Sequence, residues 1–423
     1  MTTPVSDDLE QRFAALAGSH ERMFWLDGGG ARAWSGRPSI LGALREEDVS
    51  LTYDAATRTV TRHVAGTSDV VGDDVFTVLA EEVARDGGDT SVSWVGYLGY
   101  ACRPDLPAHT GGPAPDAVWM RVRDPLFVEH PAGPEHTRAP GRADGPATPR
   151  DYADAFAEVQ RQLRLGNSYE VNLTYRETLA SDVDPVTAYL RLRAASPAPY
   201  AGFLRHPHLG GHVHVLSSSP ERFALVERDG WLETKPIKGT TPRGATPADD
   251  ERLRLSLATD PKYRAENLMI VDLLRNDLSM VCTPGTVTVP ELMAVESYAS
   301  VHQLVSTVRG RLRPGTGTVE ALRALVPAGS MTGAPKLRTM QVIEQVEPTP
   351  RGVYAGAFGW IGADGRADLG VVIRTLVATD GGPGTGRAWT LGTGGAITVR
   401  SDVDEEWAES RWKAERLLAV LDG

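Results

Sequence analysis

The stretch WLETKPIKGTTPRG, Trp231 to Gly244, has the pattern of a β-strand that runs into a turn. Pro236 fixes its own φ, and Gly239 permits backbone conformations that other residues avoid. Lys238 lies between them. Two interpretations of this amine stay open: a charge on a turn, solvated or in a salt bridge, or a group that the backbone aims at a substrate.

The residues before this stretch extend it into a hairpin. SSSPERF leads into FALVERDGWLETKPI, which predicts two paired strands over 222–237. The pairing brings Glu221 and Lys238 to the same end of a sheet. They form a salt bridge there, or they are an acid and a nucleophile that face one substrate. A partly desolvated lysine has a lowered pKa and becomes a usable nucleophile.

Composition limits the class of protein. The chain has 423 residues, of which 41% are hydrophobic and 23% charged, as in a globular protein with ample core. A net charge of -11, with basic and acidic residues interspersed, argues against a nucleic-acid surface. Two cysteines are too few for a disulfide framework. The chain has no apolar run near the roughly 20 residues of a membrane span and no signal-peptide pattern at its start, so a cytoplasmic location is expected.

Residues 131–150 are crowded with proline and glycine and predict a linker or exposed loop. They separate a strand-rich N-terminal region, 1–130, from a C-terminal region, 151–423. Helices are expected at 73–87, 148–166 with Thr148 as N-cap, 185–196, 263–278, 334–346 and 404–421. Hairpins are expected at 51–64 and 222–237, and strands at 90–103, 169–176, 212–219, 302–312, 355–362, 368–379 and 387–399. Because strands and helices intermingle without regular alternation, the fold class is α+β.

Acidic residues on the last helix are candidates for a metal site. Glu406 and Glu409 are three residues apart, and Lys413 follows four after Glu409. On a helix these residues lie on one face. Two carboxylates make a partial Mg²⁺ site that water and substrate can complete. An ordinary surface ladder of glutamate and lysine is the alternative.

The apolar helix at 263–278 carries charges that must find partners if it is buried, because an unpaired buried charge costs several kcal/mol. Glu266 is one of them. It belongs either to an internal ion-pair network or to a functional site.

Two glycine-rich turns are candidates for anion sites. PAGSMTGAPK is not a phosphate loop, because Pro335 precedes Lys336 and Leu337 stands where a hydroxyl would hold Mg²⁺. In LGTGGAITV, Gly394 and Gly395 could present backbone N–H groups to an anion. A simple bend between strands remains the alternative for this second turn.

Taken in order, eight segments resemble the chorismate-utilising enzymes, a family that includes anthranilate, aminodeoxychorismate, isochorismate and salicylate synthases. The segments are SSSPERF, PIKGT, RAENLMIVDLLRNDL, GSMTGAPK, YAGAFGWIG, IRT, GTGGAI and EWAESRWKA. The resemblance is dense over residues 150–421 and looser before them. It implies a large two-sheet β-sandwich flanked by helices, as in anthranilate synthase component I. The active site would lie between the sheets, and residues 1–130 would pack on the same sandwich.

The resemblance also implies roles for individual residues. Glu266 and Glu409 match the family's Mg²⁺ carboxylates, and Glu406 matches a supporting carboxylate. Lys413, Gly394 and Gly395 match positions around the ring carboxylate of chorismate, which the metal would also bind. Tyr354 and Arg374 match residues that hold the enolpyruvyl carboxylate, and Thr240 falls among the substrate-binding positions. Glu221 matches the general acid that protonates the departing 4-hydroxyl, a role that requires a raised pKa.

Within the family, Lys238 separates the branches. Anthranilate synthase-like members usually carry PIAGT, whereas members resembling aminodeoxychorismate synthase component I carry PIKGT. In that branch the amine attacks ring C2 with loss of the 4-hydroxyl, and ammonia then displaces it at C4. The product, 4-amino-4-deoxychorismate, would feed 4-aminobenzoate and folate or a secondary metabolite. The alternatives are an anthranilate or 2-amino-2-deoxyisochorismate synthase and a catalytically inactive regulatory homologue.

The resemblance implies a separate glutamine amidotransferase subunit as the ammonia source, because neither Cys102 nor Cys282 lies in the Gly-rich elbow of a glutaminase. Three departures from the family patterns accompany it. Glu170 stands where isochorismate and salicylate synthases carry a water-activating lysine. His302 is one residue away from the family's usual histidine position, which Gln303 occupies, so His302 is left out of the site. FWLDGG, at 24–29, differs from the motif of members that bind tryptophan.

Overall fold

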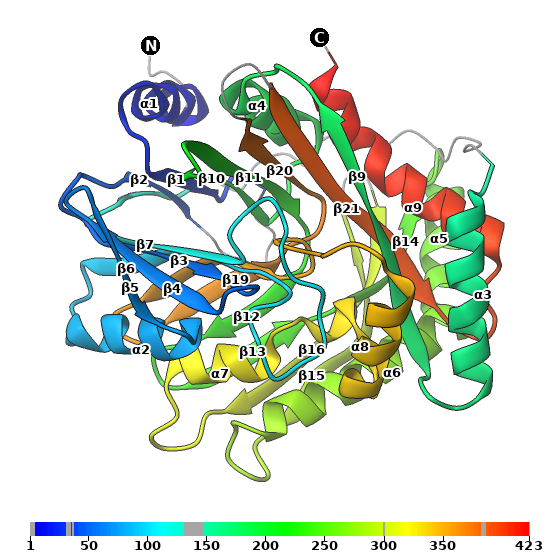
Figure 1. Cartoon of the computed structure of the whole chain (residues 1–423). Helices are drawn as coiled ribbons and strands as arrows, with labels where there is room; N and C mark the ends of the chain where they lie inside the picture. The colour runs from blue at the N-terminus through cyan, green and yellow to red at the C-terminus, as the bar shows by residue number, and fades with distance from the viewer. Residues whose placement is uncertain are drawn as a thin grey trace.

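The computed structural model describes residues 5–30, 35, 38–130, 147–298, 301–381 and 386–422, without the side chains of 5–7. Its described part is built on two antiparallel sheets with helices on their outer faces (Figure 1). This arrangement confirms the predicted α+β sandwich. Most of the predicted linker lies outside the described residues, and the proposed boundaries at 130 and 151 stay predictions.

The first sheet has nine strands among the described residues. In spatial order they are β17 (Gly333–Ala334), β9 (Glu170–Ala180), β21 (Arg387–Ile397), β20 (Thr375–Asp380), β11 (Gly211–Ser219), β10 (Tyr200–His208), β1 (Met23–Asp27), β2 (Ser39–Ala43) and β8 (Leu126–Val128).

The second sheet has twelve. Its order is β14 (Ile237–Pro242), β16 (Val301–Arg311), β13 (Trp231–Lys235), β12 (Arg222–Val226), β19 (Ala367–Val371), β18 (Ala357–Gly362), β6 (Val92–Leu98), β7 (Ala117–Arg123), β3 (Ser50–Asp54), β4 (Thr59–Val64) and β5 (Thr67–Gly72), and β15 (Thr288–Ser297) pairs with β16.

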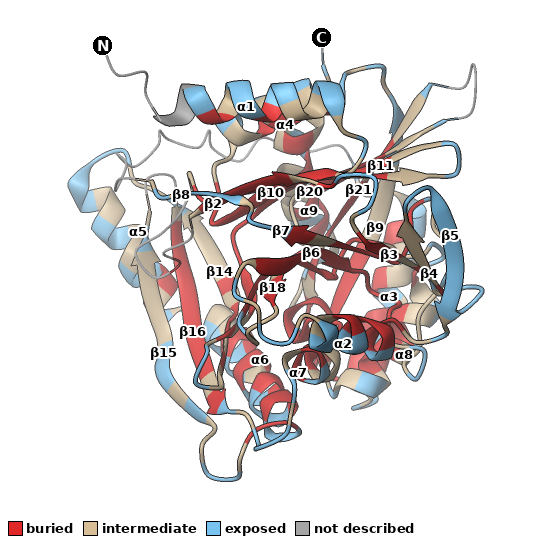
Figure 2. Cartoon of the chain, turned by 90° about the vertical axis from the view of Figure 1, so that its left-hand side faces the viewer, coloured by how far each residue is buried: buried red, intermediate tan, exposed pale blue. Residues whose placement is uncertain are grey.

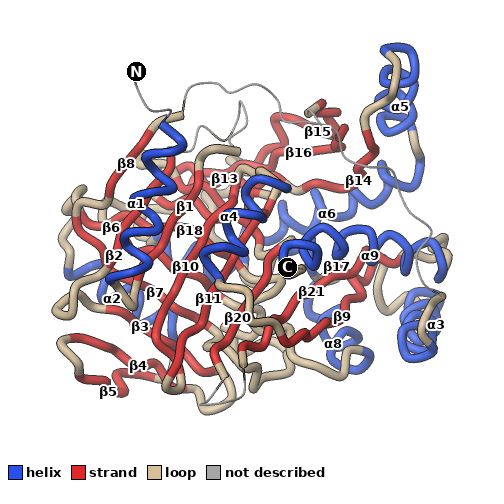
Figure 3. Tube along the Cα trace, turned by 90° about the horizontal axis from the view of Figure 1, so that it is seen from above, coloured by secondary structure: helices blue, strands red, loops and turns tan. Residues whose placement is uncertain are grey.

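Helices cover the outer faces of both sheets. They are α1 (Val5–Ser19), α2 (Val75–Arg85), α3 (Arg150–Arg164), α4 (Pro185–Ala195), α5 (Pro247–Thr259), α6 (Pro261–Ser279), α7 (Thr318–Leu325), α8 (Lys336–Val346) and α9 (Val403–Leu418), with short 3-10 turns η1 (Gly329–Met331) and η2 (Ala419–Leu421). Seen from above, α1 and α4 lie over strands of the first sheet (Figure 3). Within the described residues, no helix is long and apolar enough to cross a membrane.

The core has layers, and strand β1 shows why. All five of its residues are buried. Because side chains alternate across a strand, Phe24 and Leu26 face the second sheet while Met23 and Trp25 pack in the cluster beneath α1 and α4. A strand covered on both faces is apolar throughout, which explains the dark red band of buried strands in Figure 2.

Two local predictions were wrong. Thr148 does not cap α3: Pro149 is the N-cap residue, and the Thr148 hydroxyl instead bonds Asp404 on α9 at 2.5 Å. The segment 368–379 is not one strand but two, β19 and β20, which belong to different sheets. The chain crosses between the sheets next to Arg374, whose φ is 49°. A positive φ at an arginine has no sequence signal comparable to a glycine.

Candidate active site

A cavity of about 370 Å³ is lined by residues from both sheets. Strand β14 of the second sheet and strand β21 of the first line it, helices α6 and α9 contribute charged side chains, and the connections that carry Glu221 and Arg374 contribute two more. Every predicted site residue lines this cavity: Glu221, Lys238, Thr240, Glu266, Tyr354, Arg374, Gly394, Gly395, Glu406, Glu409 and Lys413. Residues more than 180 positions apart in the sequence therefore meet in one place.

The backbone around Lys238 explains how its amine reaches the cavity. Strands β13 and β14 both pair with β16, and the register shifts between Ile237 and Thr240. Such a bulge changes the direction of a side chain. Gly239 has φ 92°, and a Cβ there would lie 2.9 Å from the Tyr263 ring. The turn therefore needs glycine at 239, and it places Lys238 inside the protein.

Lys238 has a different partner from the predicted one. Its Nζ donates to Oε1 of Glu170 at 2.5 Å, across from one sheet to the other. Burial opposes the charge of the Lys238 ammonium, but the carboxylates of Glu170, Glu266 and Glu221 outweigh it and raise the pKa of this lysine. The salt bridge to Glu221, one of the two alternatives from the hairpin, is not formed among the described residues, and burial alone does not set the pKa of this lysine.

Glu221 lies in the short connection between β11 and β12 and lines the same cavity as Lys238. Its Oε1 accepts a hydrogen bond from the Ser330 hydroxyl at 2.6 Å. Burial raises the pKa of Glu221 to about 7, against the smaller opposing effects of Ser330, Lys238 and Arg374. A carboxyl with this pKa is protonated in a large fraction of molecules at neutral pH, as a general acid must be.

Three carboxylates converge on the cavity from two helices. Glu266 lies on α6, whereas Glu406 and Glu409 lie one turn apart on α9. Glu406 accepts from Lys262 at 3.0 Å, and Glu409 pairs with Lys413 at 2.8 Å. Glu406 Oε1 also accepts from the Ser401 hydroxyl at 2.8 Å, and all three carboxylates line the same cavity, where they can share a ligand.

The Glu266 carboxylate fits a bound cation. Its buried Oε1 has no hydrogen-bond partner among the described residues. Burial raises its pKa to about 7, and the nearby carboxylates of Glu170 and Glu406 add to this effect while Lys238 and Lys262 oppose it. Oxygen donors with excess negative charge are the ligands that Mg²⁺ prefers. Elsewhere on the same helix Asp277 pairs with Lys336 at 2.6 Å, so the predicted ion-pair network is confirmed there.

The two glycines of the GTGGAI segment have different tasks. A Cβ on Gly394 would lie 2.2 Å from the backbone oxygen of Leu173 on β9. A Cβ on Gly395 would instead lie 3.1 Å from Oε2 of Glu406, on the cavity side. Lys413 donates to the Gly394 carbonyl oxygen at 3.2 Å. Gly394 thus permits close packing of two strands, and Gly395 keeps space beside the carboxylates.

This difference yields a prediction. Gly394→Ala is expected to destabilise the fold by about 1–3 kcal/mol or more, because its methyl group overlaps a backbone atom. Gly395→Ala is expected to leave the midpoint of thermal unfolding nearly unchanged and to weaken the binding of a ligand in the cavity at least about tenfold, or about 1.4 kcal/mol. Thermal unfolding and calorimetric titration measure the two effects. Equal loss of stability in both variants would contradict the assignment.

Tyr354 and Arg374 form another part of the wall. The Tyr354 ring packs where a side chain at Gly392 would lie, since a Cβ there would be 2.2 Å from the ring. The guanidinium of Arg176 lies 4.9 Å from the centre of the same ring. Burial raises the pKa of Tyr354 to about 12, so its hydroxyl stays a neutral donor. The arrangement suits the carboxylate of a substrate.

Sequence reasoning missed several cavity residues. Ser330, Lys262, Tyr263 and Asn172 all line the cavity. Ser330 sits inside the quoted GSMTGAPK segment, which was the available signal. Gln303 also lines the cavity, opposite Thr240 on the neighbouring strand.

His302, which was left out of the predicted site, lies beside Asp250 and Ser297. Its ring bonds Asp250 at 3.0 Å and Ser297 at 2.8 Å, and it does not line the cavity.

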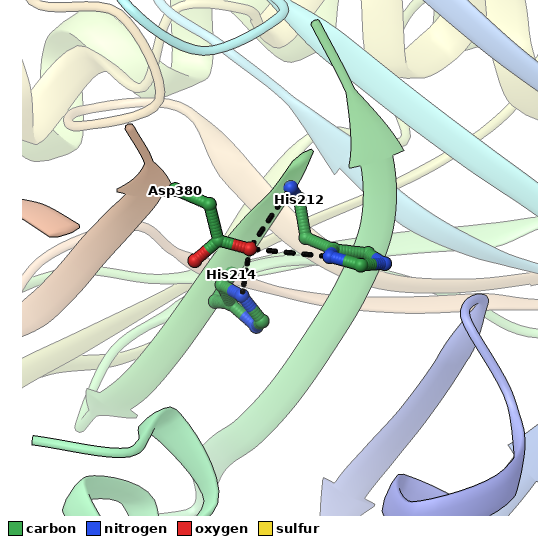
Figure 4. Close-up of side chains that lie close together, drawn as sticks. All are labelled: His212, His214 and Asp380. Carbon is green, nitrogen blue, oxygen red and sulfur yellow. Dashed lines mark hydrogen bonds and ion pairs between the residues drawn. The ribbon is translucent and has the colours of Figure 1, made fainter. Parts of the chain in front are cut away.

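A second cluster of possible metal ligands lies outside this cavity. Figure 4 shows His212 and His214 of β11 beside Asp380 of β20. Oδ2 of Asp380 is 3.1 Å from Nδ1 of His212 and 3.6 Å from Nε2 of His214. Arg387 already donates to the other carboxylate oxygen at 2.8 Å and balances its charge. We assign this cluster to ion pairing at the far end of β11.

Comparisons with known proteins agree with the geometry. A family model described as chorismate binding enzyme matches residues 46–419. Aminodeoxychorismate synthase of Streptomyces pristinaespiralis is 40% identical over 98% of this chain, which spans 64% of that protein's length. Anthranilate synthase component 1 of Streptomyces coelicolor is 36% identical over 77% of this chain and 72% of its own. The crystal structure of anthranilate synthase component I from Streptococcus pneumoniae superposes with a TM-score of 0.71 at 25% identity, covering 90% of this chain and 92% of that one.

Proposed function

Because the chain belongs to the family of chorismate-binding enzymes, we propose that it makes 4-amino-4-deoxychorismate from chorismate and ammonia. The observation that carries this proposal is Lys238, a buried amine that a glycine-dependent bulge directs into the cavity lined by Glu221. The relative from Streptomyces pristinaespiralis, named aminodeoxychorismate synthase, supports it. The similar anthranilate synthase component 1 makes anthranilate formation the second candidate.

Chorismate carries two carboxylates, and the cavity offers a basic group for each. Arg374 and the neutral Tyr354 hydroxyl hold the enolpyruvyl carboxylate, for which a planar guanidinium has the right shape. Lys413 and the backbone around Gly395, which line the same cavity, would bind the ring carboxylate. With both ends held, the ring lies between Lys238 and Glu221, so that nucleophile and acid act on one bound conformation.

The reaction needs two displacements. The neutral Lys238 amine attacks ring C2, the double bond shifts, and the C4–O bond breaks as Glu221 protonates the departing hydroxyl. Ammonia then attacks C4, the double bond shifts back, and the lysine nitrogen leaves from C2. Two allylic displacements leave the new amine at C4, whereas a single one would place it at C2. The lysine therefore decides between the 4-amino and 2-amino products.

We assign a Mg²⁺ ion to Glu266 and Glu409, with Glu406 as a supporting carboxylate. When bound, Mg²⁺ offsets the negative charge of the ring carboxylate beside these acidic side chains. Burial and the orphaned oxygen of Glu266 support the assignment. The chain's own part is to hold three carboxylates on two helices at the cavity wall.

A thermal-unfolding experiment tests the metal site without any turnover. Mg²⁺ at one hundred times its dissociation constant is expected to stabilise the wild type by about 2.7 kcal/mol. Glu266→Gln is expected to lose this stabilisation, because an amide supplies no negative charge. Asp272→Asn is the matched control, since Asp272 lies on the same helix but is exposed and paired with Arg275. Equal Mg²⁺ stabilisation of Glu266→Gln and the wild type would refute the site.

The product distinguishes the candidate functions. The pure chain is incubated with chorismate, Mg²⁺ and an ammonium salt, followed by a lyase that aromatises aminodeoxychorismate. We expect 4-aminobenzoate. Anthranilate in its place would overturn the main proposal in favour of the second candidate. Absence of both products, while chorismate still binds, would indicate an inactive homologue.

We also propose that ammonia comes from a glutamine amidotransferase partner. A glutaminase uses a cysteine with a lowered thiol pKa. Both cysteines of this chain are buried. Burial raises the pKa of Cys282 to about 11 and that of Cys102 well above its ordinary value. Neither thiol suits the hydrolysis of glutamine. The product would then serve 4-aminobenzoate and folate formation or a secondary metabolite.

A further inference from the structure

The partner of Lys238 is a feature that the proposed reaction does not yet use. Glu170 is the first residue of β9 and has no exposed surface. Its Oε1 accepts the hydrogen bond from Nζ of Lys238, and its Oε2 has no hydrogen-bond partner among the described residues. Glu170 does not line the cavity. It therefore contacts the Lys238 amine without lining the cavity that a substrate would fill.

The charge state of Lys238 makes this contact important. An ammonium has no lone pair, so the amine must lose a proton before it attacks carbon. The groups that act on Lys238 are Glu170 from β9, Glu266 from α6 and Glu221 from the β11–β12 connection. Glu221 must keep its proton for the leaving hydroxyl, and Glu266 belongs to the metal site. Within the described part of the chain, Glu170 alone accepts a hydrogen bond from Nζ.

We propose that Glu170 is the proton acceptor of Lys238 and returns the proton when the lysine leaves; this rests on the proposed function. The ammonium gives one proton to Oε1, and the neutral amine bonds to C2 while Glu221 releases the 4-hydroxyl as water. When ammonia bonds to C4, the C2–N bond breaks and Lys238 leaves as a neutral amine. Glu170 then reprotonates it, and the new ammonium at C4 reprotonates Glu221. The sum is chorismate plus ammonia giving product plus water.

The pair has a testable consequence for pH dependence. Internal transfer between Lys238 and Glu170 releases no proton to solvent, so it does not depend on pH while the pair stays intact. Glu170→Gln keeps an oxygen that can accept the hydrogen bond but cannot take the proton. In that variant Lys238 must lose its proton to solvent, and this becomes easier as pH rises.

The experiment follows the covalent adduct rather than the final product. Enzyme, Mg²⁺ and chorismate are mixed without ammonia from about pH 6 to about pH 9. Intact-protein mass spectrometry then gives the rate at which the chain gains chorismate less one water. At about pH 6 the Glu170→Gln rate is expected to be about 10²-fold below that of the wild type. The ratio of the two rates is expected to approach one at high pH. Titration of Glu221 affects both proteins equally and cancels in the ratio.

Two further variants control the result. Glu170→Asp keeps a carboxylate and is expected to retain the wild-type pH profile at a lower rate. Glu296→Gln neutralises the partner of another buried lysine, Lys235, 2.9 Å away and outside the cavity, and is expected to leave rate and profile unchanged. If Glu170→Gln fails to fold, Glu170→Asp decides: a rate that rises with pH relative to the wild type refutes the role.

The possible results distinguish a failure of this inference from a failure of the proposed function. A rate ratio that is constant with pH would show that Glu170 only orients Lys238. If Glu170→Gln is faster than the wild type at every pH, Glu170 only stabilises the ammonium form of Lys238 in the free chain. Either result overturns the inference and leaves the lysine adduct intact. No adduct on the wild type at any pH would instead overturn the proposed function.

Discussion

Lys238→Ala is expected to lose 4-amino product by roughly 10³-fold or more, because it removes the atom that bonds to C2 in the proposed reaction. The adduct, measured as added mass on the intact protein, is expected to vanish at the same time. Chorismate binding should persist, since Arg374, Tyr354 and Lys413 are untouched. The variant can also permit direct attack of ammonia at C2, which liquid chromatography would reveal as a 2-amino product.

The control for this variant is Lys235→Ala. Lys235 is also buried and paired with carboxylates, at 3.1 Å from Glu291, but it does not line the cavity. We expect Lys235→Ala to lower the free energy of unfolding and to keep adduct formation. Wild-type rates of 4-amination in Lys238→Ala would show that no covalent route through this lysine exists.

Glu221→Gln is expected to slow adduct formation by about 10²–10⁴-fold, the usual contribution of a general acid. Wild-type kcat/KM should fall as pH rises through about 7, because burial sets the pKa of Glu221 there and only the protonated form can donate. The Gln variant should lack this fall. Stopped-flow rates across the pH range measure both effects.

Ser330→Ala provides a matched control for the acid. The Ser330 hydroxyl stabilises the Glu221 carboxylate and so lowers its pKa. Removing it should raise the pKa and move the fall in kcat/KM to higher pH, while the acid itself remains. An unchanged pH profile in both Glu221→Gln and Ser330→Ala would mean that another group protonates the leaving hydroxyl.

The sequence predicts the local features of this site well, for a physical reason. Proline and glycine have distinctive φ preferences, so the bend around Lys238 could be inferred from its neighbours Pro236 and Gly239. The ordered family segments identified the other candidate site residues, and all residues matched to them line one cavity. Their proposed roles stay predictions.

Contacts between distant strands were not predictable in the same way. Glu170 is 68 residues from Lys238 and on the other sheet, and no periodicity reports a pairing across a sandwich. The crossing at Arg374 was missed because the apolar run on both sides continues the strand pattern. Both errors concern contacts and connections between the two sheets. The residue pattern of a single strand carries no information about them.

The bulge in β14 also bears on how this enzyme family diversifies. The strained conformation belongs to Gly239, whereas Lys238 is not among the residues with positive φ. An ordinary backbone at 238 accepts many side chains without refolding the turn. A single substitution at 238 can therefore remove the proposed nucleophile while Gly239 keeps the shape of the turn. The stability cost of such a change comes from the ion pair and not from the backbone, because the buried Glu170 carboxylate loses its ammonium partner, at about 3–5 kcal/mol.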